Sequence, residues 1–314
     1  MKKKLLAGIL ALALCSTNMP PQTIFAGEFT SGNMEEVSEE TSEVFTDNDQ
    51  ESAEETEEEL SVFTSESVPE FSNEANVMPA TVNGEQPIEI NLTTPIAPEY
   101  SKYYNSRYNC WIINSGGSYR FNGYGSQTSH PIYINAGFSN VVIYLNNVNI
   151  VTDSNSASAL HIESNNAYIY LENDNYLETR NETNEKHTLE IDPRSCLTTI
   201  NNSSNNNNGS LTVKSINSHG IYSYSPLIID GSSVTASSRS GIGIGGKSSN
   251  ITVNGGSVIA SSTHGTGIGG EKSNITVNGG SVIASSTHGT GIGGEKSNIT
   301  VNGGSVIASS THGT

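Results

Sequence analysis

The sequence predicts an all-β protein, a right-handed parallel β-helix (β-solenoid) with about 24 residues per coil, preceded by a disordered acidic segment. Three observations predict it. The 24 residues GIGGEKSNITVNGGSVIASSTHGT at Gly267–Thr290 recur unchanged at Gly291–Thr314 and nearly unchanged at Gly243–Thr266. Within each copy, short runs such as ITV and SVIAS have the alternation of half-buried strands. Gly, Asn and Ser separate these runs, as the corners of a coil require.

The coil pattern extends upstream of the identical copies. The segment PLIIDGSSVTASSRSGI aligns with the next copy at the same offset of 24, so we expect regular coils over residues 227–314 and a β-helix over 85–314. The runs PIYIN, NVVIYLNNVNI, AYIYLEN, HTLEI and GSLTVKS are predicted as strands of earlier coils with longer connections, and NNSSNNNNGS as a loop. In the regular coils, alternation predicts Ile259 outward, with the inward positions at Ile251, Val253, Val258 and Ala260.

The N-terminal part is organised differently. Lys2, Lys3 and Lys4 precede the apolar run LLAGILALAL, which predicts a signal peptide over residues 1–26 that takes Cys15 with it. Residues 27–84 contain seventeen of the 32 acidic residues and no Lys or Arg, so we expect a disordered, self-repelling acidic linker. The protein is therefore expected to be secreted or at the cell surface, with no membrane insertion after signal cleavage.

Composition argues against a conventional globular enzyme. Only 34% of the 314 residues are hydrophobic, and the net charge is −18. No nucleic-acid partner is expected. Cys110 and Cys196 remain after signal cleavage, and both a disulfide and a pair of buried free thiols are consistent with the sequence.

The succession NVVIYLNNVNI, SALHIES, AYIYLEN, GSLTVKS and HGIYSYSPLIIDGSSVTASS resembles a bacterial carbohydrate-binding domain family of lyase-like right-handed parallel β-helices. The likeness covers roughly residues 85–260, and the later GIGG…ITVNGGSV coils resemble solenoid repeats of secreted bacterial surface proteins. The resemblance implies the β-helical fold and a polysaccharide partner.

The sequence departs from the family pattern at acidic positions. His219 and Ser240 stand where the family has an acid before Gly-Ile, and Tyr224-Ser225 and Lys247-Ser248 replace Lys-Asp. Because Ca²⁺ requires several oxygen ligands, and the sequence shows no clustered acids, no cofactor and no metal site are predicted, with Ca²⁺ left as an unsupported alternative. For the same reason no catalytic residue is assigned and the protein is not expected to be an enzyme.

Tyrosines are the candidate binding residues. Alternation places Tyr133, Tyr144, Tyr168 and Tyr170 outward, and strands in neighbouring coils would align these rings on one flat face. Such a face suits the apolar faces and hydroxyls of sugar rings. The alternative is that tyrosine simply suits a half-exposed sheet surface.

Other residues are given structural roles. The segment Tyr100–Trp111 is expected to cap the N-terminal end of the solenoid. Repeats of 24 predict a column of surface imidazoles (His264, His288, His312), an amide ladder (Asn254, Asn278, Asn302) and an apolar ridge (Ile259, Ile283, Ile307). A last coil without a cap would expose a strand edge, which predicts either end-to-end self-association or a sequence that is a fragment of a longer repeat array.

These observations favour a non-catalytic, polysaccharide-binding β-helix. The first alternative is a structural or adhesive solenoid that binds a protein or itself, chiefly through the coils after Leu227. The second is a degenerate polysaccharide lyase.

Overall fold

A computed structural model describes residues 86–93, 98–153, 157–180, 186–192, 195–202 and 209–313. All of them belong to one compact unit, Phe71–Thr314. The predicted signal peptide and acidic linker lie outside the described residues. Among the described residues, no helix is both long and apolar enough to cross a membrane.

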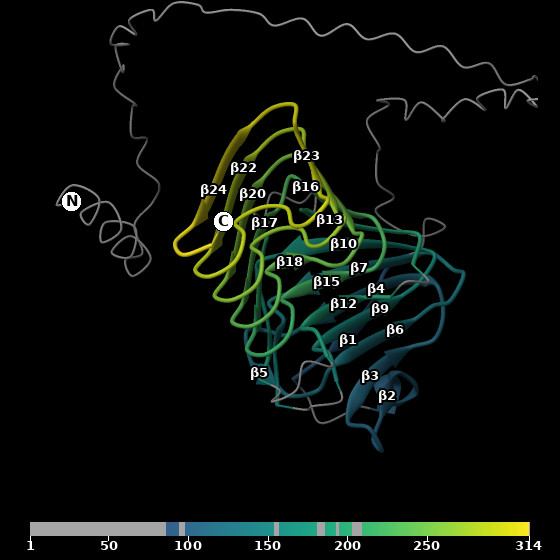
Figure 1. The fold of residues 1–314 in the computed structure, drawn as a ribbon. Coiled ribbons are helices and arrows are strands. Elements are labelled where there is room, and N and C mark those ends of the chain that lie inside the picture. The colour runs from purple at the N-terminus through teal and green to yellow at the C-terminus, as the bar shows by residue number, and fades with distance from the viewer. Residues whose placement is uncertain are drawn as a thin grey trace, which may run out of the picture. The chain divides into compact units, whose positions relative to one another are not determined.

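The predicted parallel β-solenoid is confirmed, as the stacked strands in Figure 1 show. The chain visits three sheets in turn, which we name A, C and B in the order of the chain. Sheet A has nine strands, β1 (Ile88–Asn91), β4 (Gly117–Asn122), β7 (Val141–Asn146), β10 (Asn166–Glu172), β13 (Leu197–Asn202), β16 (Leu227–Asp230), β19 (Asn250–Val253), β21 (Asn274–Val277) and β23 (Asn298–Val301).

Sheet C has eight strands, β5 (Gln127–Thr128), β8 (Asn149–Thr152), β11 (Asp174–Thr179), β14 (Ser210–Ser215), β17 (Ser233–Ser238), β20 (Ser257–Ser262), β22 (Ser281–Ser286) and β24 (Ser305–Ser310). Sheet B has seven strands, β2 (Tyr104–Asn105), β3 (Cys110–Ile113), β6 (Ile132–Asn135), β9 (Leu160–Glu163), β12 (Leu189–Ile191), β15 (Ile221–Ser223) and β18 (Ile244–Gly245).

Successive coils pair in register. In the regular part, Ile251 lies opposite Ile275, and Ile275 opposite Ile299, so that identical side chains stack along the solenoid. The inward residues of the three sheets form one apolar core. The predicted directions are confirmed at the four inward positions of coil 243–266, which are buried, and at Ile259, which is exposed.

The two final coils differ from the predicted three strands per coil. There sheet B is reduced to isolated bridges, from Ile244 to Ile268 and from Ile268 to Ile292. Gly269 and Gly270 follow Ile268 with φ of +114° and +145°. Gly245, the counterpart of Gly269 in the preceding coil, has a similar φ of +138° and ends the two-residue strand β18, so in each copy the GIGG segment leaves the extended conformation directly after its isoleucine.

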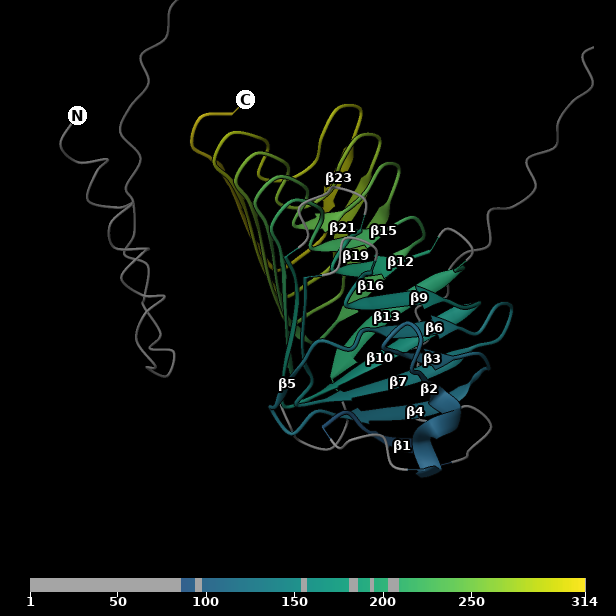
Figure 2. The ribbon, with the colours of Figure 1, turned by 90° about the horizontal axis from the view of Figure 1, so that it is seen from below.

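The predicted N-terminal cap is present. A 3₁₀ helix, η1 (Pro98–Tyr103), leads into β2, which pairs antiparallel with β3 at the edge of sheet B (Figure 2). Tyr100, Tyr103 and Tyr104 pack against the core, and the Tyr104 ring lies 5.0 Å, edge-on, from the buried Trp111. These rings cover apolar surface at the edge of sheet B, beyond which the described residues provide no further strand.

The predicted ladders also form. The rings of His264, His288 and His312 stack at 5.2 Å between centroids. Asn278 Nδ2 donates to Asn254 Oδ1 at 2.9 Å, and Asn302 Nδ2 donates to Asn278 Oδ1 at 2.8 Å. A second amide ladder at Asn250, Asn274 and Asn298, which the sequence analysis did not predict, has the same form. The ridge residues Ile259, Ile283 and Ile307 are exposed.

Cys110 and Cys196 are both free thiols in this structure. Cys110 is buried, as one of the two sequence alternatives proposed, whereas Cys196 is exposed.

Candidate functional site

Chemically varied side chains gather on the outer face of sheet B. In β6, β9, β12 and β15, the residues that alternate with the buried Ile and Leu point outward. Parallel register places them side by side, as Tyr133 opposite His161, His161 opposite Glu190 and Glu190 opposite Tyr222. We call this row, with the adjoining Glu163, Asp192 and Tyr224, the sheet B strip.

An aromatic hollow forms the N-terminal end of the strip. It has a volume of about 290 Å³ and is lined by Tyr108, Cys110, Ile112, Pro131, Tyr133, Asn135 and Ala157. Tyr108 is 65% exposed. Burial raises the pKa of Tyr133 to about 12, so its hydroxyl stays protonated and can donate a hydrogen bond at neutral pH. The hollow thus combines ring faces with a donor and the amide of Asn135.

A histidine between acidic side chains occupies the middle of the strip. His161 Nδ1 lies 3.9 Å from Glu190 Oε2, and His161 Nε2 lies 3.9 Å from Asp192 Oδ2. Burial alone would raise the pKa of Glu190, but His161, the Ser158 hydroxyl and Lys186 lower it to about 2. Glu190 is therefore a carboxylate at neutral pH, and its Oε2 accepts a 2.6 Å hydrogen bond from Ser158 Oγ.

Stacked rings form the C-terminal end of the strip. The rings of Tyr222, His187 and His219 contact one another in a cluster of three, with centroids 4.0 Å apart for His187 and Tyr222, 4.6 Å for His219 and Tyr222, and 4.7 Å for His187 and His219. Tyr224 packs edge-on against Tyr222 at 4.6 Å. Burial lowers the pKa of His187 to about 4, and burial and then His187 lower that of His219 to about 3. Both rings are thus neutral at pH 7, and the 46% exposed Tyr224 offers a second ring to solvent.

The four predicted tyrosines do not share one face. Tyr133 lies on sheet B, whereas Tyr144, Tyr168 and Tyr170 lie on the outer face of sheet A. The rings of Tyr144 and Tyr170 stack at 5.1 Å, but each residue is only 6% exposed, and Tyr168 packs against them. The guanidinium of Arg120 lies 4.7 Å from the Tyr144 ring centroid. This cluster points outward and is nevertheless largely covered.

Sequence reasoning missed the central residues His161, Glu163, Glu190 and Asp192. The acidic side chains were expected to be scattered, and the structure corrects this, because consecutive coils bring these four together. The available signal was the alternation in LHIE and LEI, which turns His161 and Glu190 outward. Their separation of 29 residues, not 24, hid the pairing, since this coil has a longer connection.

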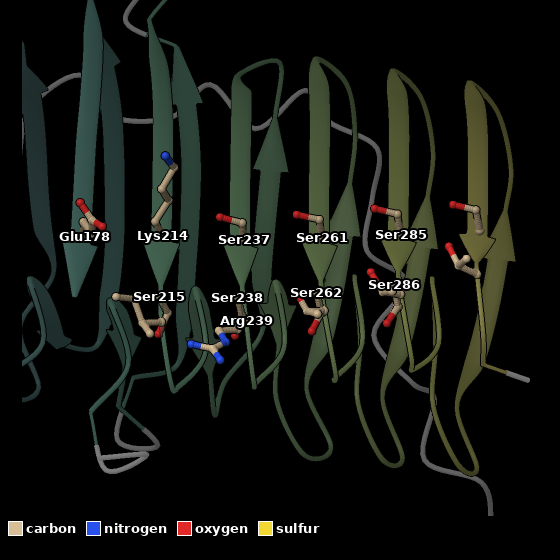
Figure 3. A pocket seen from close by; sticks show the side chains of 15 residues that line it. Glu178, Lys214, Ser215, Ser237, Ser238, Arg239, Ser261, Ser262, Ser285 and Ser286 are labelled. Atoms are coloured by element: carbon tan, nitrogen blue, oxygen red, sulfur yellow. The ribbon is translucent and has the colours of Figure 1, made fainter. Parts of the chain in front are cut away.

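A second surface, a groove of about 510 Å³, runs along sheet C. Figure 3 shows Ser237, Ser261 and Ser285 pointing the same way from neighbouring strands, with Lys214 and Glu178 at one end. The register is exact from one coil to the next, so the hydroxyls repeat at about 4.8 Å. The groove is hydroxyl-rich and contains no aromatic ring.

Comparison with known proteins places the chain in a family. A family model described as carbohydrate-binding domain-containing protein matches residues 108–314. The match begins at the aromatic hollow, later than the resemblance suggested, and extends through the regular coils. Neither the curated proteins nor the solved structures include a match to this chain.

Proposed function

The chain belongs to the family of carbohydrate-binding domain-containing proteins, and from this premise we propose that it binds a polysaccharide along the sheet B strip, outside the cell and without turnover. The observation that carries the proposal is the aromatic hollow at Tyr108 and Tyr133, which adjoins a row of hydrogen-bonding side chains. Tyrosine ring faces pack against the C–H faces of sugars, while carboxylates and amides bind the hydroxyls.

The dimensions of the strip favour a chain over a single sugar. Three strand spacings separate β6, which carries Tyr133, from β15, which is roughly 14 Å at about 4.8 Å each. An extended glycan along the solenoid axis would therefore span several sugar units, from Tyr133 to Tyr224.

Sheet A supports the proposal less well. The stack of Tyr144 and Tyr170 has little exposed ring surface, so a sugar could pack on it only after rearrangement. We therefore retain Tyr133 as the principal predicted binding residue and assign Tyr144, Tyr168 and Tyr170 a packing role on sheet A.

Export and the absence of catalysis belong to the same proposal. The basic residues and apolar run at the N-terminus support export to the cell surface or medium. We propose no catalytic residue, because the family match supports a binding role. A lyase would draw on the acids around His161, and it would release shortened chains.

The test is retention of the full chain on insoluble plant and bacterial polysaccharides. We expect Tyr133→Ala to weaken retention about five- to tenfold, which corresponds to about 1–1.4 kcal/mol of lost ring contact. Tyr133→Phe should bind within about twofold of the parent, since the ring face is kept. Tyr170→Ala is the matched control on sheet A and should alter stability more than retention.

Three outcomes would contradict the proposal. Retention on no polysaccharide would favour the structural or adhesive solenoid, whose best support is the exposed ridge at Ile259, Ile283 and Ile307. If Ser261→Ala lost retention and Tyr133→Ala did not, the binding site would lie in the sheet C groove and not on the sheet B strip. Release of soluble oligosaccharide by the parent would show turnover.

A further inference from the structure

We propose that His161, Glu163 and Asp192 form a binding site for one divalent transition-metal ion, of which Zn²⁺ is the probe. Each residue brings one ligand atom into a group whose members all lie within 4.8 Å of one another. The inference goes beyond polysaccharide binding and does not depend on it.

The geometry fits an ion between these atoms. Zinc lies about 2.0–2.2 Å from imidazole nitrogen and carboxylate oxygen, so at tetrahedral angles two of its ligand atoms lie about 3.4 Å apart. His161 Nε2 and Asp192 Oδ2 are 3.9 Å apart, so a closure of about half an ångström places both on one ion. Glu163 follows His161 by two residues on β9, on the same outward side, and completes the group by a small side-chain rotation.

The other nitrogen of His161 provides an independent argument. Nδ1 faces Glu190 Oε2 at 3.9 Å, and that carboxylate is held in turn by the Ser158 hydroxyl. A histidine that ligates a metal ordinarily gives its second N–H to such a carboxylate, which fixes the tautomer and orients the ring. Glu190 is thus placed to accept the Nδ1–H of His161 once Nε2 ligates the ion, after the 3.9 Å separation shortens to a hydrogen bond.

The donor set indicates the class of ion. One imidazole with two carboxylates suits Zn²⁺ and similar ions, whereas Ca²⁺ and Mg²⁺ prefer sites built from oxygen alone. Because His161 and Glu163 belong to one coil and Asp192 to the next, the ion would also link two coils. Bound metal should therefore raise the stability of the solenoid.

The experiment is calorimetric titration of the full, metal-stripped chain with Zn²⁺ at pH 7.5. We expect one saturable equivalent, a rise in the thermal midpoint, and at least a tenfold weaker affinity in His161→Gln. Glu163→Gln is the second variant, because its half-buried position makes loss of folding a lesser concern. His288→Gln is the matched control, since it removes an imidazole from the exposed column at 264, 288 and 312.

Each outcome decides the proposal. Unchanged zinc affinity in both His161→Gln and Glu163→Gln would overturn it, as would the absence of any saturable equivalent in the parent. Loss of binding in His288→Gln alone would assign the zinc to the exposed imidazole column.

Discussion

The seven histidines of this protein experience very different surroundings. His264, His288 and His312 stack in solvent, whereas His187 and His219 contact each other and the Tyr222 ring and are largely withdrawn from water. His187 Nδ1 lies 2.6 Å from Ser218 Oγ, and His219 Nδ1 accepts a 2.7 Å hydrogen bond from the Ile242 amide. Both rings are neutral in the folded protein at pH 7, and protonation would place a positive charge in a site that is largely withdrawn from water.

These two histidines predict loss of stability in mild acid. The folded pKa values, about 4 for His187 and about 3 for His219, lie below the ordinary 6.5, so the unfolded chain binds protons first as pH falls. The free energy of unfolding should therefore decrease between pH 6.5 and 4, by up to about 1.4 kcal/mol per pH unit for each ring. Glu190, with its pKa of about 2, adds to the loss only below pH 4.5.

Urea denaturation at pH 7.5, 6 and 5 measures this slope. His187→Gln should reduce it by up to about half, while His288→Gln should leave it unchanged because that ring is exposed. If the free energy of unfolding of His187→Gln depended on pH as steeply as that of the parent, the loss of stability in acid could not be assigned to His187.

For single residues, the sequence predicts whether a side chain points inward or outward better than it predicts which sheet carries that residue. Alternation correctly turned Ile251 inward and Ile259 outward, because a strand fixes the side of each residue. It did not predict that Tyr133 and Tyr144 lie on different sheets. Assignment to a sheet depends on the corners between strands, and the early coils have corners of unequal length.

The glycine corners between strands allow neighbouring coils to stack closely. In the NGG corner after β19, Gly256 has a φ of +81°, and a Cβ there would lie 2.1 Å from the Ser232 carbonyl oxygen of the preceding coil. At the neighbouring Gly255 the nearest atom would be the Gly231 nitrogen at 3.6 Å, an ordinary contact. Two adjacent glycines therefore have different roles, one for close approach and one without such a constraint.

This difference gives a matched pair of substitutions. Gly256→Ala should lower the free energy of unfolding by about 1–3 kcal/mol, because it forces both a strained φ and a displaced coil. Gly255→Ala should change it by less than about 1 kcal/mol. Chemical denaturation of both variants measures these changes. Equal changes in the free energy of unfolding would show that the corner can shift to accommodate a Cβ at Gly256, contrary to the prediction.

Element-level prediction succeeded where the sequence repeats. Each ITV and SVIAS run is a strand, and the aromatic segment before Trp111 caps the core. The third strand of the last coils was overpredicted, because sheet B retains only single bridges at Ile268 and Ile292 there. The β12 pairing that assembles His161 with Glu190 required knowledge of loop length, which the repeat does not contain.

The whole molecule is a stack whose coils contact only their neighbours, and this predicts tolerance to removal of one coil. Deletion of Gly267–Thr290 should leave a folded protein with a denaturant m-value lower by roughly one eighth, because one of eight coils is lost. Polysaccharide retention should persist, since the sheet B strip lies upstream of the deletion.

Deletion of only Gly267–Asn278 is the control. This deletion removes β21, so the sheet C sequence of β22 would follow β20 directly and enter the place of a sheet A strand, and the variant should not give a cooperative unfolding transition. Cooperative unfolding of the half-coil variant, or failure of the whole-coil variant to fold, would contradict the nearest-neighbour description.

The identity of the last coils also bears on how the chain finds its own structure. β21 matches β23 as well as it matches β19, with the same inward side chains and the same amide ladder. A pairing displaced by a full 24 residues therefore keeps every local contact, and register selection cannot reject it. Only the irregular coils before Ile242 are unique along the axis. These unique coils define the correct register for the identical copies that follow. Folding that begins in them therefore avoids looped-out coils, whereas folding that begins among the copies can pair strands one coil out of register.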